Sequence, residues 1–169
     1  MIEQIPPWGT VSKWEKVNQG LNYLIKKHKK KLSLVFDLAR EIEKELELIF
    51  PVQDKLCLLT CSNCPDPCCL NATVWFDFKD LLFIHLTGFF VPHHQLIEKR
   101  GDQCTYHSPK GCRLHRLARP WTCTLYFCPS QNNNFKLRNN DAIIDYENSI
   151  GFLKTARIKL ENDFIDVVS

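Results

Sequence analysis

The chain has 169 residues, of which 44% are hydrophobic and 24% charged, and its formal net charge is +3. This length and composition fit one domain over residues 1–169. The net charge is too small to argue for a nucleic-acid partner by itself, and no run reaches the roughly 18 to 20 apolar positions of a membrane helix. The opening residues MIEQIPPWGT hold an acid and two prolines where a secretory signal has its apolar segment, which predicts a cytoplasmic, reducing setting.

Residues 1–50 are predicted to be helical. Ser12 and Glu15 have capping-box spacing, and apolar positions then recur at intervals of three and four residues. A second amphipathic pattern follows the run KKHKKK (26–31) and is expected to stop at Pro51, so the segment is an α-hairpin or one broken helix. We assign the lysines to a solvated helix end, since no aromatic residues interleave them. The expected core faces are Trp14, Val17, Leu21, Leu24 and Ile25, then Leu34, Val35, Leu38, Ile42, Leu46 and Ile49.

Three further stretches complete the predicted organisation. Residues 77–87 form a helix that ends at Gly88, with His85 as a histidine of the core rather than a ligand. Residues 101–135 show no sustained period and are expected to be ordered loop. Residues 141–168 return to a helical pattern. The predicted fold class is therefore mainly α, with helical N- and C-terminal flanks around a loop-rich centre over residues 57–130.

The nine cysteines are the unusual feature of the composition, and all of them lie in that centre. An odd count and a reducing setting argue against a disulfide framework, and clustered thiols in such a setting favour metal ligation. A metal would also fix a loop-rich centre in place. A nucleophilic cysteine with a histidine base stays open, because such partners meet in space rather than in sequence. The cysteines are Cys57, Cys61, Cys64, Cys68, Cys69, Cys104, Cys112, Cys123 and Cys128.

Eight of these thiols, from Cys61 to Cys128, are the candidate metal ligands. Cys61 and Cys64 have the two-residue spacing that delivers two sulfurs to one ion. Cys68 and Cys69 are adjacent, and successive side chains diverge in most backbone conformations. We therefore expect either that they serve two metals, or that one is a ligand and the other packs or bridges. Eight thiols can fill two four-cysteine sites or one four-thiolate cluster with others nearby. Cys57, in an apolar stretch, is predicted to be a packed free thiol.

A buried thiolate site also needs positive charge nearby. Four thiolates around Zn²⁺ or around a 4Fe–4S core leave a net negative charge. Arg119, four residues before Cys123, is the expected cation next to the ligands. Arg113 and Arg116 are equally well explained as surface charges. His115 has a ligand-compatible spacing from the cysteine at 112, but the thiols are the stronger candidates.

The order of these motifs resembles the YkgJ-type cysteine-cluster family. The resemblance covers residues 61–128, and the helical flanks lie outside it. That family is described as a zinc- or iron-chelating domain, and its members are often labelled iron–sulfur proteins. Thr124 stands where many members have a basic residue. The residues that carry the likeness are Cys61, Cys64, Cys68, Cys69, Cys104, Gly111, Cys112, Leu114, Arg119, Pro120, Cys123, Tyr126 and Cys128.

The sequence therefore predicts a metal-binding cysteine-cluster protein. The resemblance implies an iron–sulfur cluster, 4Fe–4S being one form, with a redox or electron-transfer role and a protein redox partner. One alternative is a structural Zn²⁺ in an adaptor or interaction module, because thiolates ligate both metals. A second alternative is a metal-dependent enzyme that acts on a protein or a small molecule, for which no catalytic residue is assigned.

Overall fold

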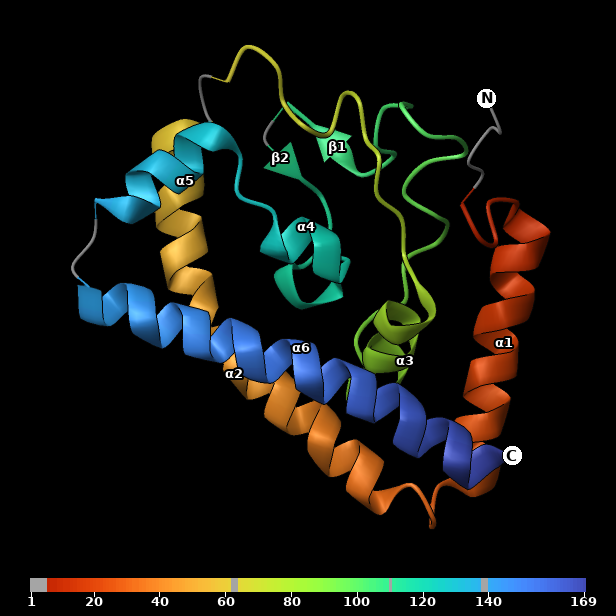
Figure 1. Cartoon of the computed structure of the whole chain (residues 1–169). Helices are drawn as coiled ribbons and strands as arrows, with labels where there is room; N and C mark the ends of the chain where they lie inside the picture. Colours follow the sequence, from red (N-terminus) through yellow and green to blue (C-terminus); the bar gives the residue numbers. More distant parts are fainter. Residues whose placement is uncertain (1–5, 62–63, 110, 138–139) are drawn as a thin grey trace.

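The computed structural model describes residues 6–61, 64–109, 111–137 and 140–169. Within these ranges the chain is mainly helical, with one very small sheet, and the predicted helical flanks enclose the central segment (Figure 1). This confirms the predicted fold class. The elements are α1 (Val11–His28), α2 (Ser33–Thr60), α3 (Phe78–Thr87), β1 (His107–Ser108), β2 (Gly111–Cys112), η1 (Arg116–Ala118), α4 (Trp121–Leu125), α5 (Pro129–Lys136) and α6 (Asn140–Val168).

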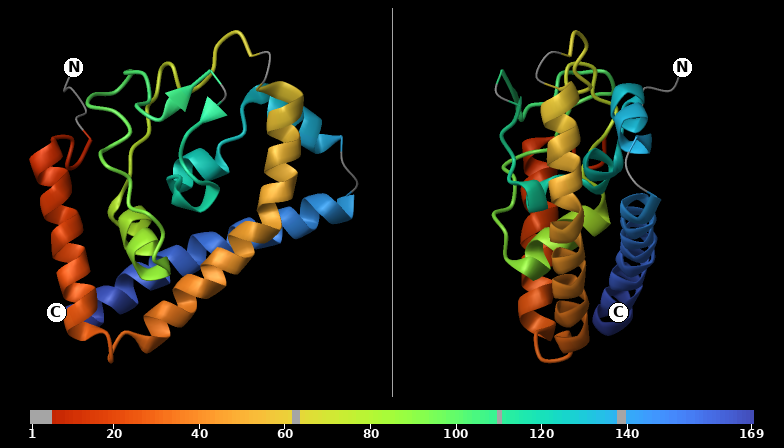
Figure 2. Two further views of the ribbon diagram at one scale, coloured as in Figure 1. Left: turned by 180° about the vertical axis from the view of Figure 1, so that it is seen from behind. Right: turned by 90° about the vertical axis from the view of Figure 1, so that its left-hand side faces the viewer.

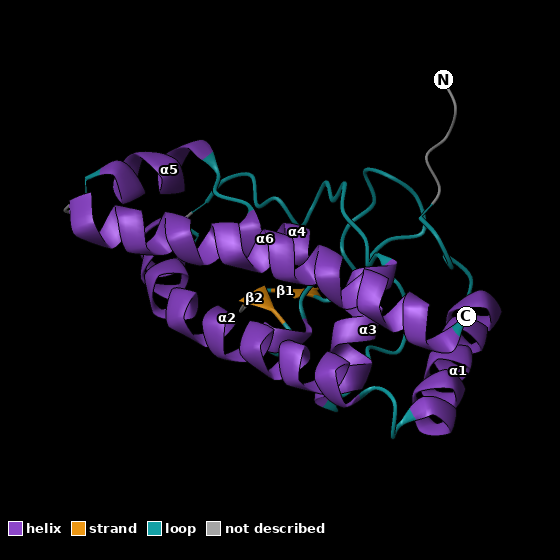
Figure 3. Cartoon of the chain, turned by 60° about the horizontal axis from the view of Figure 1, so that its bottom comes forward, coloured by secondary structure: helices purple, strands orange, loops and turns teal. Residues whose placement is uncertain are grey.

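The two longest helices form a frame on which the rest of the chain is built. α2 and α6 lie side by side, and α3 packs against both of them (Figure 3). α1 packs against α3 and α6 and rises at one end of the frame, so that α3, α4 and the β1–β2 hairpin lie between α1 and the upper part of α2 (Figure 2). The side chains of Ile42, Leu153 and Phe164 are almost wholly buried in this frame.

Most of the predicted core face is confirmed. Trp14, Leu21 and Ile25 of α1 are buried, as are all but two of the predicted positions of α2. Leu34 is wrong, since 77% of its surface is exposed. The predicted capping box at Ser12 is also wrong: Thr10 is the N-cap, and its hydroxyl accepts a hydrogen bond from the Lys13 amide at 3.4 Å.

The prediction that Pro51 ends the second helix is wrong in an informative way. α2 continues through Pro51 to Thr60, and it changes direction in that region (Figure 2). Proline removes one helical hydrogen bond and crowds the preceding turn, which bends a helix when tertiary contacts hold both halves. The continuation places Cys57 in the last turn of α2 and Cys61 at its C-cap, beside α5.

The third helix is confirmed at both ends. Asp77 and Asp80 form a reciprocal capping box at its start, and Gly88 ends it with φ +75°, a conformation that suits glycine. His85 is a satisfied histidine, as predicted: its Nε2 lies 2.8 Å from the Asn18 side-chain oxygen, and burial lowers its pKa.

Residues 101–135 are less irregular than predicted. The segment contains the β1–β2 hairpin, the short η1 and the helices α4 and α5. Pro120 is the N-cap residue of α4, and Pro129 is the first residue of α5, where the fixed φ of proline suits the start of a helix. These helices are too short to leave a periodic pattern in the sequence.

Two surface features bear on partners. The lysines of the run at 26–31 are exposed around the turn between α1 and α2, as expected for a solvated helix end, while the absence of a nucleic-acid partner stays a prediction. Among the helices of the described residues, none has the length and apolarity to cross a bilayer.

Candidate metal centre

Five of the thiols form what we call the central thiol group, made of Cys68, Cys69, Cys104, Cys112 and Cys123. The residues come from the loop before α3, the loop before β1, strand β2 and helix α4. The charges of these thiols act on one another. Those of Cys104 and Cys123 act on Cys69, and that of Cys112 acts on both Cys104 and Cys123. The fold thus gathers thiols that are up to 55 positions apart in the sequence.

A β-turn brings Cys68 and Cys69 together. The Leu70 amide donates to the Pro67 carbonyl at 2.9 Å, so the two cysteines are the central residues of the turn. Their side chains are hydrogen-bonded to each other. The expectation that adjacent side chains point apart is therefore wrong here, because it holds for extended and helical backbone rather than for a tight turn.

A backbone contact joins the two halves of the central group. The Cys104 amide donates to the Cys69 carbonyl at 2.8 Å, and the Ala72 amide donates to the Asp102 carbonyl at 3.0 Å. The first cysteine-bearing loop therefore runs beside the segment that leads to β1. Cys104 is buried, whereas Cys68 and Cys123 are exposed, so the group extends from the interior to the surface.

The titration of these thiols reflects their closeness. The hydrogen bond from Cys69 lowers the pKa of Cys68 to about 6 and raises the pKa of Cys69 itself. Desolvation, and then the charges of Cys104, Cys112 and Cys68, raise the pKa of Cys123 to about 12. Because the Cys123 side chain is partly open to solvent, this shift is informative mainly about which thiols lie near it. Thiolates that oppose one another's ionisation in this way are stabilised together by a bound cation.

Three other thiols gather around one glutamine, and we call them the Gln131 thiol group. The Gln131 side-chain amide lies 3.4 Å from the Cys57 sulfur and 3.5 Å from the Cys61 sulfur. The backbone amide of Gln131 donates to the Cys128 sulfur at 3.4 Å, and the Gln131 side-chain oxygen accepts from the Cys128 amide at 3.1 Å. Cys57 is free and half-buried, as predicted, but it is not isolated, since its thiol is also hydrogen-bonded to Cys61.

Cys64 is the one predicted ligand that the structure assigns to neither group. Its backbone amide donates to the Cys61 carbonyl at 3.3 Å. No contact of its side chain with another thiol is found among the described residues, which do not include 62 and 63.

Arg116 lies close to a thiol, and the place of Arg119 beside metal ligands stays a prediction. The charge of Arg116 acts on Cys57, and its guanidinium lies 2.6 Å from the Gln53 side-chain oxygen and 3.3 Å from Asp54. Arg119 donates to the Leu114 carbonyl at 3.3 Å, and no interaction with a thiol is found for it in the described part of the chain. Sequence spacing could not select Arg116, because the bend in α2 brings Gln53 and Cys57 to it.

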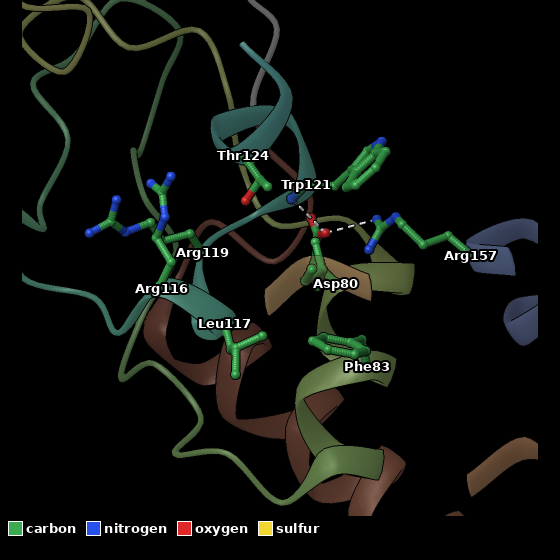
Figure 4. A pocket seen from close by; sticks show the side chains of 9 residues that line it. Asp80, Phe83, Arg116, Leu117, Arg119, Trp121, Thr124 and Arg157 are labelled. Carbon is green, nitrogen blue, oxygen red and sulfur yellow. Dashed lines mark hydrogen bonds and ion pairs between the residues drawn. The ribbon is translucent and has the colours of Figure 1, made fainter. Parts of the chain in front are cut away.

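A buried ion pair, absent from the sequence analysis, supports the helix that carries Cys123. Asp80 of α3 accepts hydrogen bonds from the Trp121 amide at 3.0 Å and from the Arg157 guanidinium at 2.8 Å (Figure 4). The Arg157 guanidinium also lies 5.1 Å from the centre of the Trp121 ring. Only 5% of the Asp80 side chain and 7% of the Arg157 side chain are exposed, and burial raises the pKa of Asp80 to about 6. The pair ties α3, α4 and α6 together.

The cavity beside this ion pair is small. It has a volume of about 10 Å³, enough for about one water molecule. Figure 4 shows the Asp80, Trp121 and Arg157 groups on one side of it, while the guanidinium groups of Arg116 and Arg119 point away from Asp80. His115 lies outside both thiol groups and stacks on Phe89 at 5.5 Å between ring centres.

The thiol groups are close assemblies rather than finished coordination shells. Within the residues that the structure describes, no three histidine, cysteine, aspartate or glutamate side chains are arranged so that they could hold a metal ion as they stand. A metal would have to draw the sulfurs of either group inward. All nine cysteines are free thiols.

Comparison with known proteins adds no assignment. No protein-family model matches the chain. No curated protein and no solved structure matches it either. The likeness of residues 61–128 to the YkgJ-type family therefore stays a prediction, and the case for a function depends on the geometry of the thiols.

Proposed function

We propose that the chain is a metal-binding cysteine-cluster protein whose central thiol group holds an iron–sulfur cluster with a redox or electron-transfer role. The observation that carries the proposal is the convergence of five thiols from four segments of the chain. These donors are all sulfur, and thiolate sulfur is the ligand that iron–sulfur clusters use. Four of the five would suffice for a 4Fe–4S cluster.

The position of the group suits the exchange of electrons with a protein partner. Cys104 is buried, which keeps one side of the centre away from water, while Cys68 and Cys123 reach the surface. A cluster held there would have a short path to a docked redox protein, and its potential would depend on hydrogen bonds to the sulfurs and on exposure. A cytoplasmic, reducing compartment would keep the thiols available as ligands.

A structural Zn²⁺ in the same group is the second candidate. The thiol-bearing loops are joined by few backbone hydrogen bonds, among them the one from the Cys104 amide to the Cys69 carbonyl. A tetrahedral zinc site would cross-link these loops directly, and the domain would then act as an adaptor or interaction module. The same thiols serve both candidates, so the metal itself decides between them.

The deciding experiment is anaerobic purification of the full chain, followed by an absorbance spectrum and elemental analysis of one sample. Iron with equimolar sulfide would support the cluster, and zinc without colour would support the structural site. Cys104→Ser should abolish the iron or zinc of this group, whereas Leu34→Ala, at an exposed position, should keep it. A chain that neither purifies with iron or zinc nor takes them up in reconstitution would overturn the proposal.

A further inference from the structure

The Gln131 thiol group has the donors of a second metal site. Cys57 lies in the last turn of α2, Cys61 is the C-cap residue of that helix, and Cys128 is the N-cap residue of α5. Gln131 reaches all three sulfurs, with its side-chain amide toward two and its backbone amide toward the third. A single small cation could take the place of these N–H donors and bind the three sulfurs directly.

We propose that Cys57, Cys61 and Cys128 form a separate site for one thiophilic cation, of which Zn²⁺ is the probe. Cys57 thereby becomes a ligand, although the family-like motif of residues 61–128 does not include it. The site does not depend on which metal the central thiol group holds. Zn²⁺ accepts three thiolates and leaves one position for a water molecule or for a fourth thiol.

The charge balance of this site is favourable. Binding of Zn²⁺ to three thiols releases three protons to the solvent and leaves a complex with one negative charge. Arg116 is the cation that lies near Cys57, and its guanidinium is held by Gln53 and Asp54. The buried Nε atom of Arg116 has no hydrogen-bond partner among the described residues. A positive charge in this place offsets the charge of a thiolate complex.

No cysteine belongs to both thiol groups. Cys61 acts on Cys57, whereas the thiols that act on Cys123 are all members of the central group. The two groups also have different supports. The last turn of α2 and the start of α5 carry the Gln131 thiol group, and a β-turn, a loop, β2 and α4 carry the central one.

Zinc-protected alkylation of the full chain, with mass spectrometry of each cysteine, tests the proposal directly. Zn²⁺ should slow the alkylation of Cys57, Cys61 and Cys128 by about tenfold or more, because a metal-bound thiolate is not free to attack. In Cys57→Ser, one equivalent of Zn²⁺ should be lost, Cys61 and Cys128 should become reactive again, and the central thiols should keep their protection. Circular dichroism would verify that this variant is folded.

Two results would overturn the second site, and neither of them would contradict the proposed function. Equal alkylation of Cys57 with and without Zn²⁺, while Cys104 and Cys123 are protected, would sink the second site alone. The second site would also be excluded if Cys57→Ser bound as many zinc equivalents as the parent. Protection of Cys57, Cys61 and Cys128 with no protection and no iron at Cys104 or Cys123 would support the site and contradict the proposed function instead.

Discussion

The helical frame and the cysteine-bearing centre are stabilised by different means. α2 and α6 bury side chains along their whole contact, with Ile42, Leu153 and Phe164 almost inaccessible. The loops of the centre instead have isolated backbone hydrogen bonds, free thiols and the buried pair of Asp80 and Arg157. Hydrophobic burial therefore stabilises the frame, whereas the centre has weaker support of its own and should respond to its charges and its thiols.

The largest effect is expected where the two regions meet, at Asp80. Asp80→Ala removes the nearer carboxylate of the buried Arg157, which keeps only Asp77 at 3.5 Å, and leaves the Trp121 amide without its acceptor. Breaking one partner of a buried ion pair costs about 3–5 kcal/mol, which urea denaturation followed by circular dichroism would measure. Lys159→Ala is the matched control, because Lys159 and Asp163 form an ion pair on the surface of α6. A loss below about 1 kcal/mol for Asp80→Ala, the range of surface ion pairs, would show that the pair does not join the regions.

Cavity formation in the frame should be the next largest effect. Leu153→Ala removes a side chain with 0% exposure in α6, whereas Leu34→Ala truncates one with 77% exposure in α2. We expect a loss of about 2–5 kcal/mol in the free energy of unfolding for the buried position. The exposed control should stay within about 0.5 kcal/mol. Equal effects at the two positions, measured by denaturant titration, would contradict the packing of α6 in the frame.

Removal of metal should separate the two regions most clearly. If the central thiol group binds metal, chelation or Cys104→Ser should speed amide hydrogen exchange in residues 64–77, 101–109 and 111–120, because β1, β2 and η1 are the only regular elements described there and they are very short. Amides of α2 near Ile42 and of α6 near Leu153 should keep their protection. Uniform acceleration in both regions would mean that the frame depends on the metal as well.

The sequence predicted the frame better than the centre for a physical reason. Long amphipathic helices leave a repeated pattern, so the buried positions of α1 and α2 and both ends of α3 could be predicted from it. Pro51 marked a disturbance, but only the packing of both halves of α2 makes it a bend rather than an end. The helices α4 and α5 are too short for a period to show.

The candidate site could be predicted as a set of residue types but not as an arrangement. Cysteine spacing identified the ligating chemistry, yet the division into two groups depends on a β-turn at Cys68 and Cys69 and on Gln131 of α5. No local pattern pairs Gln131 with Cys57, which lies 74 positions earlier. The same holds for Arg116, whose neighbours come from the bent half of α2.

The pH dependence of stability gives the finest test of the junction between frame and centre. Burial raises the pKa of Asp80 from 3.8 to about 6, so between these values the folded chain binds a proton that the unfolded chain has released. The contribution of this group is therefore fully present below about pH 4 and is lost as the pH rises to about 6. Asp80→Asn, which cannot titrate, should lack this loss.

The measurement is the difference in unfolding free energy between the parent chain and Asp80→Asn from pH 4 to pH 7, since other titrating groups cancel in it. The parent chain should lose stability relative to Asp80→Asn as the pH rises, and the difference should level off above about pH 6. An opposite slope would mean that Arg157 holds the pKa of Asp80 below its usual value, with the attraction between the charges outweighing their burial. The ion pair would then stabilise the fold as a whole. Its effect would not be limited to holding α4 and Cys123 in position.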